Sequence, residues 1–166
     1  MNSLGSSGGV EYAAVCDVYA TNREKARVMN GPGCVAYNDF RDLLDPKEID
    51  AVNIASPDHW HALIAIAACQ AGKDVYCQKP LALTIEEGRA MVTAARRYDR
   101  IFQTGSQQRS DDKFRYACEL VRNGRIGKLE RIRTAVGTNN QGWEPDTDPP
   151  PGLDWNMYLG PAKSVP

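Results

Sequence analysis

The sequence has 166 residues, of which 42% are hydrophobic and 25% are charged, and its formal net charge is −1. This composition is ordinary for a globular protein, and the near-neutral charge excludes a strongly basic surface for nucleic acid. No apolar run approaches the roughly 20 residues that a membrane span requires, and residues 1–9 lack the basic and apolar regions of a secretory signal. We therefore expect no nucleic-acid partner, no membrane and, by default, a cytoplasmic location.

The five cysteines and two histidines do not form a metal-binding pattern. The cysteines show no C-x-x-C spacing, so we expect small buried side chains in a reducing compartment rather than disulfides or a zinc site. The histidines, His59 and His61, are two positions apart at a predicted helix start and point to different faces, which argues against a shared metal ion. We predict no metal site. The cysteines are Cys16, Cys34, Cys69, Cys77 and Cys118.

Short runs of β-branched and aromatic residues alternate along the chain with stretches that have helical periodicity. Strands are predicted at residues 10–16, 34–37, 51–55, 75–77 and 101–104. Helices are predicted at residues 21–30, 39–44 and 58–71, from residue 84 onward, and between residues 110 and 122. Residues 128–136 alternate as a half-exposed strand would. The order predicts βαβ units and therefore an α/β fold with a doubly wound parallel sheet.

Each predicted helix start carries a capping signal. Thr84 with Glu87 matches the capping box, in which the two residues bond to each other's backbone N–H groups, and Thr21 with Glu24 matches it as well. The other predicted N-caps are Asn38, Asp58 and Ser110.

Lys79 lies at the carboxyl end of the predicted strand 75–77, and Pro80 ends the strand because it has no N–H group to donate. In open α/β sheets, ligands bind in the crevice beyond these strand ends, which here holds Asp17, Ser56, Lys79 and Gly105. A lysine fixed there can transfer protons, and burial can lower its pKa into a useful range. The alternative is a solvated lysine beside a turn.

Asp17 closes the first predicted strand, and an acid at that place suits a hydrogen bond to the ribose 2′-hydroxyl of NAD rather than NADP. The alternative is an ordinary turn aspartate. The glycine-rich phosphate loop that should precede this acid by about 20 residues does not fit into the residues upstream. Residues 31–36, G-P-G-C-V-A, match the loop pattern but follow a helix and lead into a strand, so we reject them.

The helix start at Asp58 offers unpaired N–H groups and a positive dipole end, which suit a nucleotide. Structural packing of His59 and His61 is the alternative.

Together these residues resemble the Gfo/Idh/MocA oxidoreductases. The resemblance covers residues 10–166 and rests on motifs in the family's order and spacing: Asp17 after V-E-Y-A-A-V-C, A-S-P-D-H-W-H-A at 55–62, A-G-K-D-V-Y-C-Q-K-P at 71–80 and G-S-Q-Q-R-S at 105–110. It implies a nicotinamide-binding Rossmann-like domain followed by an α/β domain, and hydride transfer to or from a sugar or cyclitol hydroxyl.

By motif match, the resemblance implies a cofactor site and one catalytic residue. Lys79 would be catalytic, beside the substrate hydroxyl and the nicotinamide. The cofactor-binding residues would be Asp17, Ser56, Pro57, His61, Gln78, Lys79 and Gln107. The cofactor would be NAD, with NADP less favoured, and the partner a small sugar or cyclitol. We expect a homo-oligomer in the complete protein.

Two departures from the family pattern qualify this expectation. Gln78 replaces the usual glutamate and loses the charge that would hold Lys79 protonated. The first strand with its glycine loop and most of the second domain are missing, and no histidine follows His61. We therefore expect a fragment, shortened at both ends, with a partial Rossmann-like domain at residues 1–125 and the start of a second domain at 126–166. A lost amino terminus could have carried an export signal to the periplasm.

The competing hypothesis is a non-catalytic remnant or interaction module that keeps the fold and binds nucleotide weakly. In the doubly wound order, the first strand lies between the strands at residues 10–16 and 51–55. Without it, we predict that these two strands either close up against each other or leave a central gap.

Overall fold

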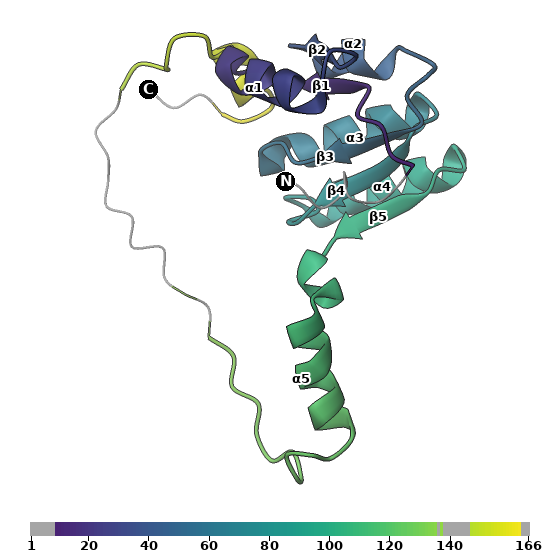
Figure 1. Ribbon diagram of the computed structural model, residues 1–166, viewed down its shortest axis with the longest axis vertical. Coiled ribbons are helices and arrows are strands. Elements are labelled where there is room, and N and C mark those ends of the chain that lie inside the picture. Colours follow the sequence, from purple (N-terminus) through teal and green to yellow (C-terminus); the bar gives the residue numbers. More distant parts are fainter. Residues whose placement is uncertain (1–8, 136, 138–146, 164–166) are drawn as a thin grey trace. The chain divides into compact units, whose positions relative to one another are not determined.

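The computed structural model describes residues 9–135, 137 and 147–163 (Figure 1). These residues group into two compact units, one within Met1–Gly105 and Pro149–Pro166 and the other within Ser106–Asp148. Residues 149–163 therefore pack with the first unit, although the sequence assigned them to the second domain. The domain boundaries at 1–125 and 126–166 stay a prediction.

The first unit contains parallel strands alternating with helices, which confirms the predicted α/β class. Its strands are β1 (Ala14–Cys16), β2 (Val35–Tyr37), β3 (Ala51–Ile54), β4 (Asp74–Gln78) and β5 (Phe102–Gly105). Its helices are α1 (Ala20–Asn30), α2 (Phe40–Leu44), α3 (His61–Gln70), α4 (Ile85–Arg97) and α6 (Trp155–Leu159), with the 3-10 turn η1 (Asp58–Trp60) before α3.

The strands form two sheets rather than one. β1 pairs with β2, and β3, β4 and β5 form a three-stranded sheet in that order, with all neighbours parallel. Within the described residues no pairing joins β1 to β3. Of the two predicted outcomes, closing up is therefore wrong for the described residues, among which no strand lies between β1 and β3, the place of the central strand in the doubly wound order.

The core of the first unit lies between the three-stranded sheet and the helices α3 and α4 (Figure 1). Val75 and Cys77 of β4 are buried on this side, while Tyr76 between them is only half-buried. The tight packing is possible because α3 presents small side chains to the sheet. The buried core residues of these elements are Ile54, Ala62, Ala65, Ala68, Cys69, Val75, Cys77, Met91 and Ala94.

One of the five predicted helix caps is observed. The box of Thr84 and Glu87 is present in both directions and starts α4. The predicted box of Thr21 and Glu24 is wrong, because α1 begins at Ala20 after Tyr19, which makes no side-chain cap. Tyr19 instead forms a bridge to Leu153, a partner far along the chain.

Three further N-cap predictions were wrong. Asp39 caps α2 in place of Asn38, and Asp111 caps α5 in place of Ser110. In both cases an aspartate one residue later makes the capping bond. Asp58 makes no cap, because the chain forms the turn η1 before α3 begins.

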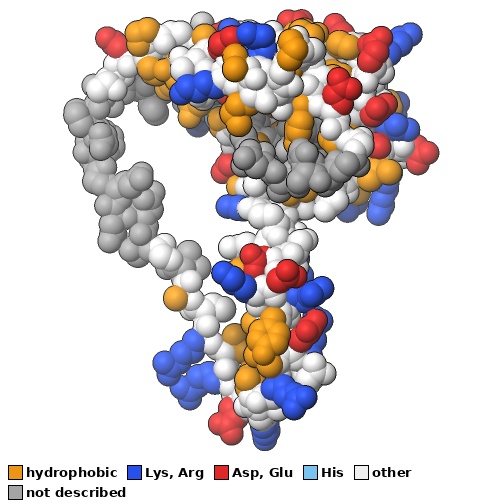
Figure 2. Space-filling model, in the orientation of Figure 1, with side chains coloured by type: hydrophobic (Ala, Val, Ile, Leu, Met, Phe, Trp, Pro, Cys, Tyr) orange, Lys and Arg blue, Asp and Glu red, His pale blue; other side chains and the backbone are white. Residues whose placement is uncertain are grey.

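The second unit consists of η2 (Gln107–Ser110), α5 (Asp112–Arg122) and the residues that follow. The strand predicted at 128–136 is wrong for residues 128–135, which form no strand and are exposed. Val136 lies outside the described residues. Hydrophobic side chains lie on the surface of this unit (Figure 2), and α5 exposes Phe114, Tyr116 and Val121. A short strand needs a neighbouring strand and a covering layer. Residues 128–135 have neither among the described residues.

Candidate active site

The candidate residues of the first unit follow the carboxyl ends of its strands. Asp17 comes directly after β1, Ser56 and Pro57 follow β3, Gln78 ends β4, and Lys79 comes after it. Because β3, β4 and β5 are parallel and in register, with Ile54 opposite Cys77 and Gln78 opposite Gly105, their ends meet at one edge of the sheet. The structure therefore brings Ser56, Pro57, Gln78 and Lys79 to one edge, as predicted.

His61 joins the turns that follow β3 and β4. Its ring is 1% exposed, with Nδ1 2.7 Å from the Pro80 carbonyl oxygen and Nε2 2.8 Å from the Ser56 carbonyl oxygen. A neutral imidazole donates from one nitrogen only, so both contacts are hydrogen bonds at once only in the doubly protonated ring. The buried ring therefore lies between the turn after β3 and the turn after β4. Its predicted contact with the dinucleotide stays a prediction.

Gln78 folds back onto the turn that carries Lys79. Its side-chain oxygen Oε1 accepts a hydrogen bond of 2.8 Å from the Lys79 backbone N–H, and the Lys79 side chain is exposed rather than buried. A Cβ atom at Gly105 would lie 2.9 Å from both the Cα and the Oε1 of Gln78. Only glycine allows this approach, so Gly105 contributes a shape requirement that its predicted place at the strand end did not reveal.

Asp17 is held in place by its neighbours. Its Oδ1 accepts a hydrogen bond of 2.8 Å from the Tyr19 N–H. The Arg23 guanidinium donates from Nη1 to the Asp17 carbonyl oxygen at 2.7 Å and to the Asn38 side-chain oxygen at 2.8 Å. The half-buried carboxylate is therefore held by the Tyr19 N–H, while Arg23 of α1 binds the Asp17 main chain at the end of β1.

Two thiols near these strand ends are chemically inert at neutral pH. Burial raises the pKa of Cys77 to about 11. Burial, with the nearby carboxylates of Asp39 and Asp17, raises the pKa of Cys16 to about 11. Neither forms the thiolate that a nucleophile or metal ligand requires. All five cysteines are free, but Cys118 is exposed, so the prediction of burial is wrong for that residue.

Ser56 carries a polar group whose bonding capacity is not used by the described residues. Its hydroxyl oxygen is buried and makes no hydrogen bond to any of them. Buried hydroxyls are nearly always bonded, so this one has a hydrogen bond left to form. No cluster of metal-binding side chains occurs among the described residues.

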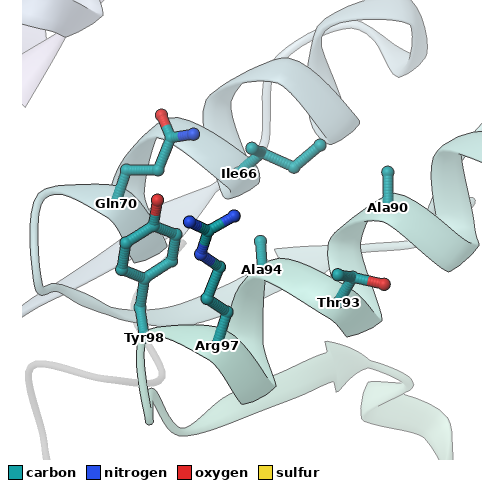
Figure 3. Close-up of a pocket in the computed structure, with 7 residues that line it drawn as sticks. All are labelled: Ile66, Gln70, Ala90, Thr93, Ala94, Arg97 and Tyr98. Carbon is teal, nitrogen blue, oxygen red and sulfur yellow. The ribbon is translucent and has the colours of Figure 1, made fainter.

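The groove between α3 and α4 (Figure 3) lies away from the sheet edge that carries Ser56, Gln78 and Lys79. It has a volume of about 260 Å³ and is lined toward the carboxyl ends of both helices, where Gln70 ends α3 and Arg97 ends α4. Ser56 and Lys79 precede the amino ends of these helices. The groove is also smaller than the roughly 300–1,000 Å³ of a typical ligand pocket, so it is not the site.

Two remaining predictions have different outcomes. Residues 31–36 follow a helix and lead into a strand, as predicted when they were rejected as a phosphate loop: Gly31 ends α1 and the chain runs into β2. Gln107 lies in η2 of the second unit, so its role near the nicotinamide stays a prediction. Sequence reasoning gave no role to Trp60, whose indole N–H donates to the Met157 carbonyl oxygen at 2.9 Å.

Comparison with known proteins identifies related enzymes. Levoglucosan dehydrogenase from Pseudarthrobacter phenanthrenivorans is 37% identical over 127 residues, covering 76% of this chain and 31% of that enzyme. Myo-inositol 2-dehydrogenase from Thermotoga maritima is 34% identical over 126 residues, covering 75% of this chain and 35% of that enzyme. The chain therefore spans about a third of the length of the curated relatives that it matches.

Solved structures of such enzymes share the fold. Myo-inositol 2-dehydrogenase from Lactobacillus plantarum matches with a TM-score of 0.67 and 36% identity over 74% of this chain and 36% of that one. Scyllo-inositol dehydrogenase from Lactobacillus casei, solved with NAD(H) and scyllo-inositol bound, matches with a TM-score of 0.62 and 34% identity over 71% of this chain and 34% of that one.

The model of the oxidoreductase family with an NAD-binding Rossmann fold, which is the Gfo/Idh/MocA family, matches residues 3–106. This match covers more than half of the chain, and the α/β architecture of the first unit agrees with a Rossmann fold. The chain belongs to the Gfo/Idh/MocA family of oxidoreductases.

Proposed function

We propose that this chain supplies the dinucleotide-binding part of an NAD-dependent oxidoreductase acting on a hydroxyl group of a sugar or cyclitol. The carrying observation is the edge of the three-stranded sheet at which Ser56, Gln78 and Lys79 meet, together with the partly buried Asp17 at the same end of β1 in the other parallel sheet. Relatives named for inositol and levoglucosan share this part of the chain and support the substrate class. A cytoplasmic location and a homo-oligomeric state remain predictions.

The residues present fit NAD. The Ser56 hydroxyl has an unused bonding position at the strand edge, and Asp17 presents a fixed carboxylate suited to a ribose hydroxyl. Bound NAD would supply the acceptor or donor of the hydride. Lys79 would orient the substrate hydroxyl and exchange its proton, because its exposed ammonium group follows a turn fixed by Gln78 and His61.

A second candidate function is nucleotide binding without turnover. Among the residues that the structure describes, no strand pairs with the facing edges of β1 and β3, which favours this function because in the doubly wound fold a strand between them leads into the phosphate-binding turn. The two candidates differ in their expected outcomes: the module would bind adenine nucleotides weakly and would not transfer hydride.

Turnover can be tested in a chimera in which this chain replaces the matching third of levoglucosan dehydrogenase. We expect NAD-dependent oxidation of levoglucosan or myo-inositol. Lys79→Met should then lower kcat at least ~100-fold, the scale typical of a general acid–base group. Lys47→Met, which changes another lysine outside the site, is the matched control. Normal turnover by Lys79→Met would refute the catalytic assignment.

Cofactor choice can be tested in the same chimera. Asp17 should favour NAD over NADP, since a carboxylate repels the 2′-phosphate. Comparison of kcat/KM for the two cofactors should show the preference for NAD, and Asp17→Ser should reduce it at least ~10-fold, the equivalent of about 1.4 kcal/mol. A clear preference for NADP in the unchanged chimera would contradict the assignment.

A further inference from the structure

Residues 149–163, which we call the latch segment, bind the loop that follows β1. The Ala20 N–H donates to the Gly152 carbonyl oxygen at 2.9 Å, and the Asp154 N–H donates to the Val18 carbonyl oxygen at 2.9 Å. Between these bonds, Tyr19 and Leu153 form an antiparallel bridge. The segment therefore pairs with the residues directly after Asp17 as a short strand would.

The same segment binds the turn that follows β3. The Trp60 indole N–H donates to the Met157 carbonyl oxygen at 2.9 Å, and the His59 Nε2 lies 2.8 Å from the Tyr158 carbonyl oxygen. Gly160 lies against the indole so closely that a Cβ atom there would come within 2.1 Å of Trp60 Cζ2. Its φ angle of +48° also favours glycine. This close contact between Trp60 and Gly160 therefore requires glycine at position 160.

These two sets of contacts connect the two sheets at the site. No backbone pairing joins β1 and β3 within the described residues, yet the latch segment binds the loops after both strands. Asn38 strengthens the first set by donating to the Asp154 carboxylate at 3.0 Å. These contacts therefore link the loop that contains Asp17 with the turn that contains Ser56.

We propose that the latch segment positions the loops after β1 and β3 relative to each other, with Trp60 and Gly160 as its positioning residues. Since Asp17 would contact the adenosine ribose, this inference rests on the proposed function: the latch segment sets the geometry of the adenosine end of the dinucleotide site. It acts through the loops rather than through contact with the substrate.

Hydrogen exchange of the 166-residue chain tests the latch directly. Gly160→Ala should raise the exchange rates of the Ala20 and Asp154 amides at least ~10-fold, because both donate to partners across the contact. The Val75 amide, bonded within the three-stranded sheet, should keep its rate. Gly88→Ala is the matched control, since a Cβ at Gly88 meets nothing within 4 Å, and it should change neither group.

Unchanged exchange at Ala20 and Asp154 in Gly160→Ala would overturn the proposal, and so would an equal rise at Val75. Trp60→Phe provides a second, milder variant, because it keeps a ring beside Gly160 but loses the bond to Met157. It should raise exchange at the same two amides by a few-fold, on the scale of one lost hydrogen bond. Unchanged exchange at those amides in this variant would also count against the proposal.

Binding of two half-cofactors, AMP and nicotinamide mononucleotide, connects the latch with the site. Titration by NMR should show that Gly160→Ala weakens AMP binding at least ~5-fold and leaves nicotinamide mononucleotide binding unchanged. Equal weakening of both would overturn the role at the adenosine end. If the unchanged chain binds neither probe, the proposed function and that role fail, whereas the exchange rates still decide whether the latch holds the loops.

Discussion

The two sheets of the first unit differ in how they are stabilised. Strands β3 and β4 contribute buried residues to a core shared with α3 and α4, and Val75 and Cys77 are at most 3% exposed, while Phe102 of β5 packs against this core. Neither β1 nor β2 has a buried residue, and Val35 of β2 is 50% exposed. Both sheets are parallel and have similar local sequences, so local preference alone does not create a core.

The difference shows what a central strand does in this fold. In the doubly wound order, both β1 and β3 would pair with it, and its helix would cover part of the sheet. Without that neighbour in the described residues, the two-stranded sheet is tied to the rest of the unit through α2, Trp60 and the latch segment. The candidate site residues come from both sheets, since Asp17 follows β1 and Ser56 follows β3.

The largest effect should come from a cavity in the core that the three-stranded sheet shares with its helices. Met91 of α4 is 2% exposed in this core, and Met91→Ala should lower the free energy of unfolding by about 2–5 kcal/mol. Val35→Ala, in the other sheet, is the matched control and should cost less than about 1 kcal/mol because half of its surface is already exposed. Urea unfolding measures both. Equal losses would show that the two sheets are equally packed.

The residues that were predicted correctly from the sequence depend on nearby partners. The strand before Lys79 follows from its β-branched and aromatic residues and from Pro80, and the box of Thr84 and Glu87 spans one helical turn. The start of α1 was missed because Tyr19 pairs with Leu153, more than a hundred residues away. Local sequence patterns do not predict a pairing with a residue so far along the chain.

In the candidate site, too, some features follow from the local sequence and others depend on residues far apart in the chain. Its position at the strand ends could be predicted, because parallel strands place their carboxyl ends at one edge. The two contacts of His61 could not, since the Ser56 and Pro80 carbonyl groups are brought together only by the pairing of β3 with β4. The need for glycine at Gly105 likewise depends on the Gln78 side chain across the strand pair.

The two histidines allow the turns of the three-stranded sheet to be compared with the latch. A neutral His61 ring donates to one of the Ser56 and Pro80 carbonyl groups, so His61→Phe removes one hydrogen bond in a buried place and the free energy of unfolding should fall by about 1–3 kcal/mol. His59→Phe removes one contact, to Tyr158, at a half-buried position, and should cost about 0.5–1.5 kcal/mol. Thermal and urea unfolding measure both variants, and a larger loss for His59→Phe would reverse the comparison.

The smallest effect should be a pH dependence of the latch. The backbone hydrogen bond from Met157, followed by the bond from the Asn38 side chain, lowers the pKa of Asp154 below its usual range. A carboxyl whose pKa is lower in the folded state stabilises fully above its unfolded pKa of about 3.9, and this contribution is lost as the pH falls through the folded value. The latch should therefore hold at pH 6 and loosen below about pH 4.

The NMR signal of the Trp60 indole N–H, followed from pH 6 to pH 3, should report this loosening. Asp154→Asn keeps a side-chain oxygen but no ionisable group, so the indole signal of this variant should change less across the same range. An identical pH response in both proteins would assign the loosening to other groups and remove Asp154 from the latch.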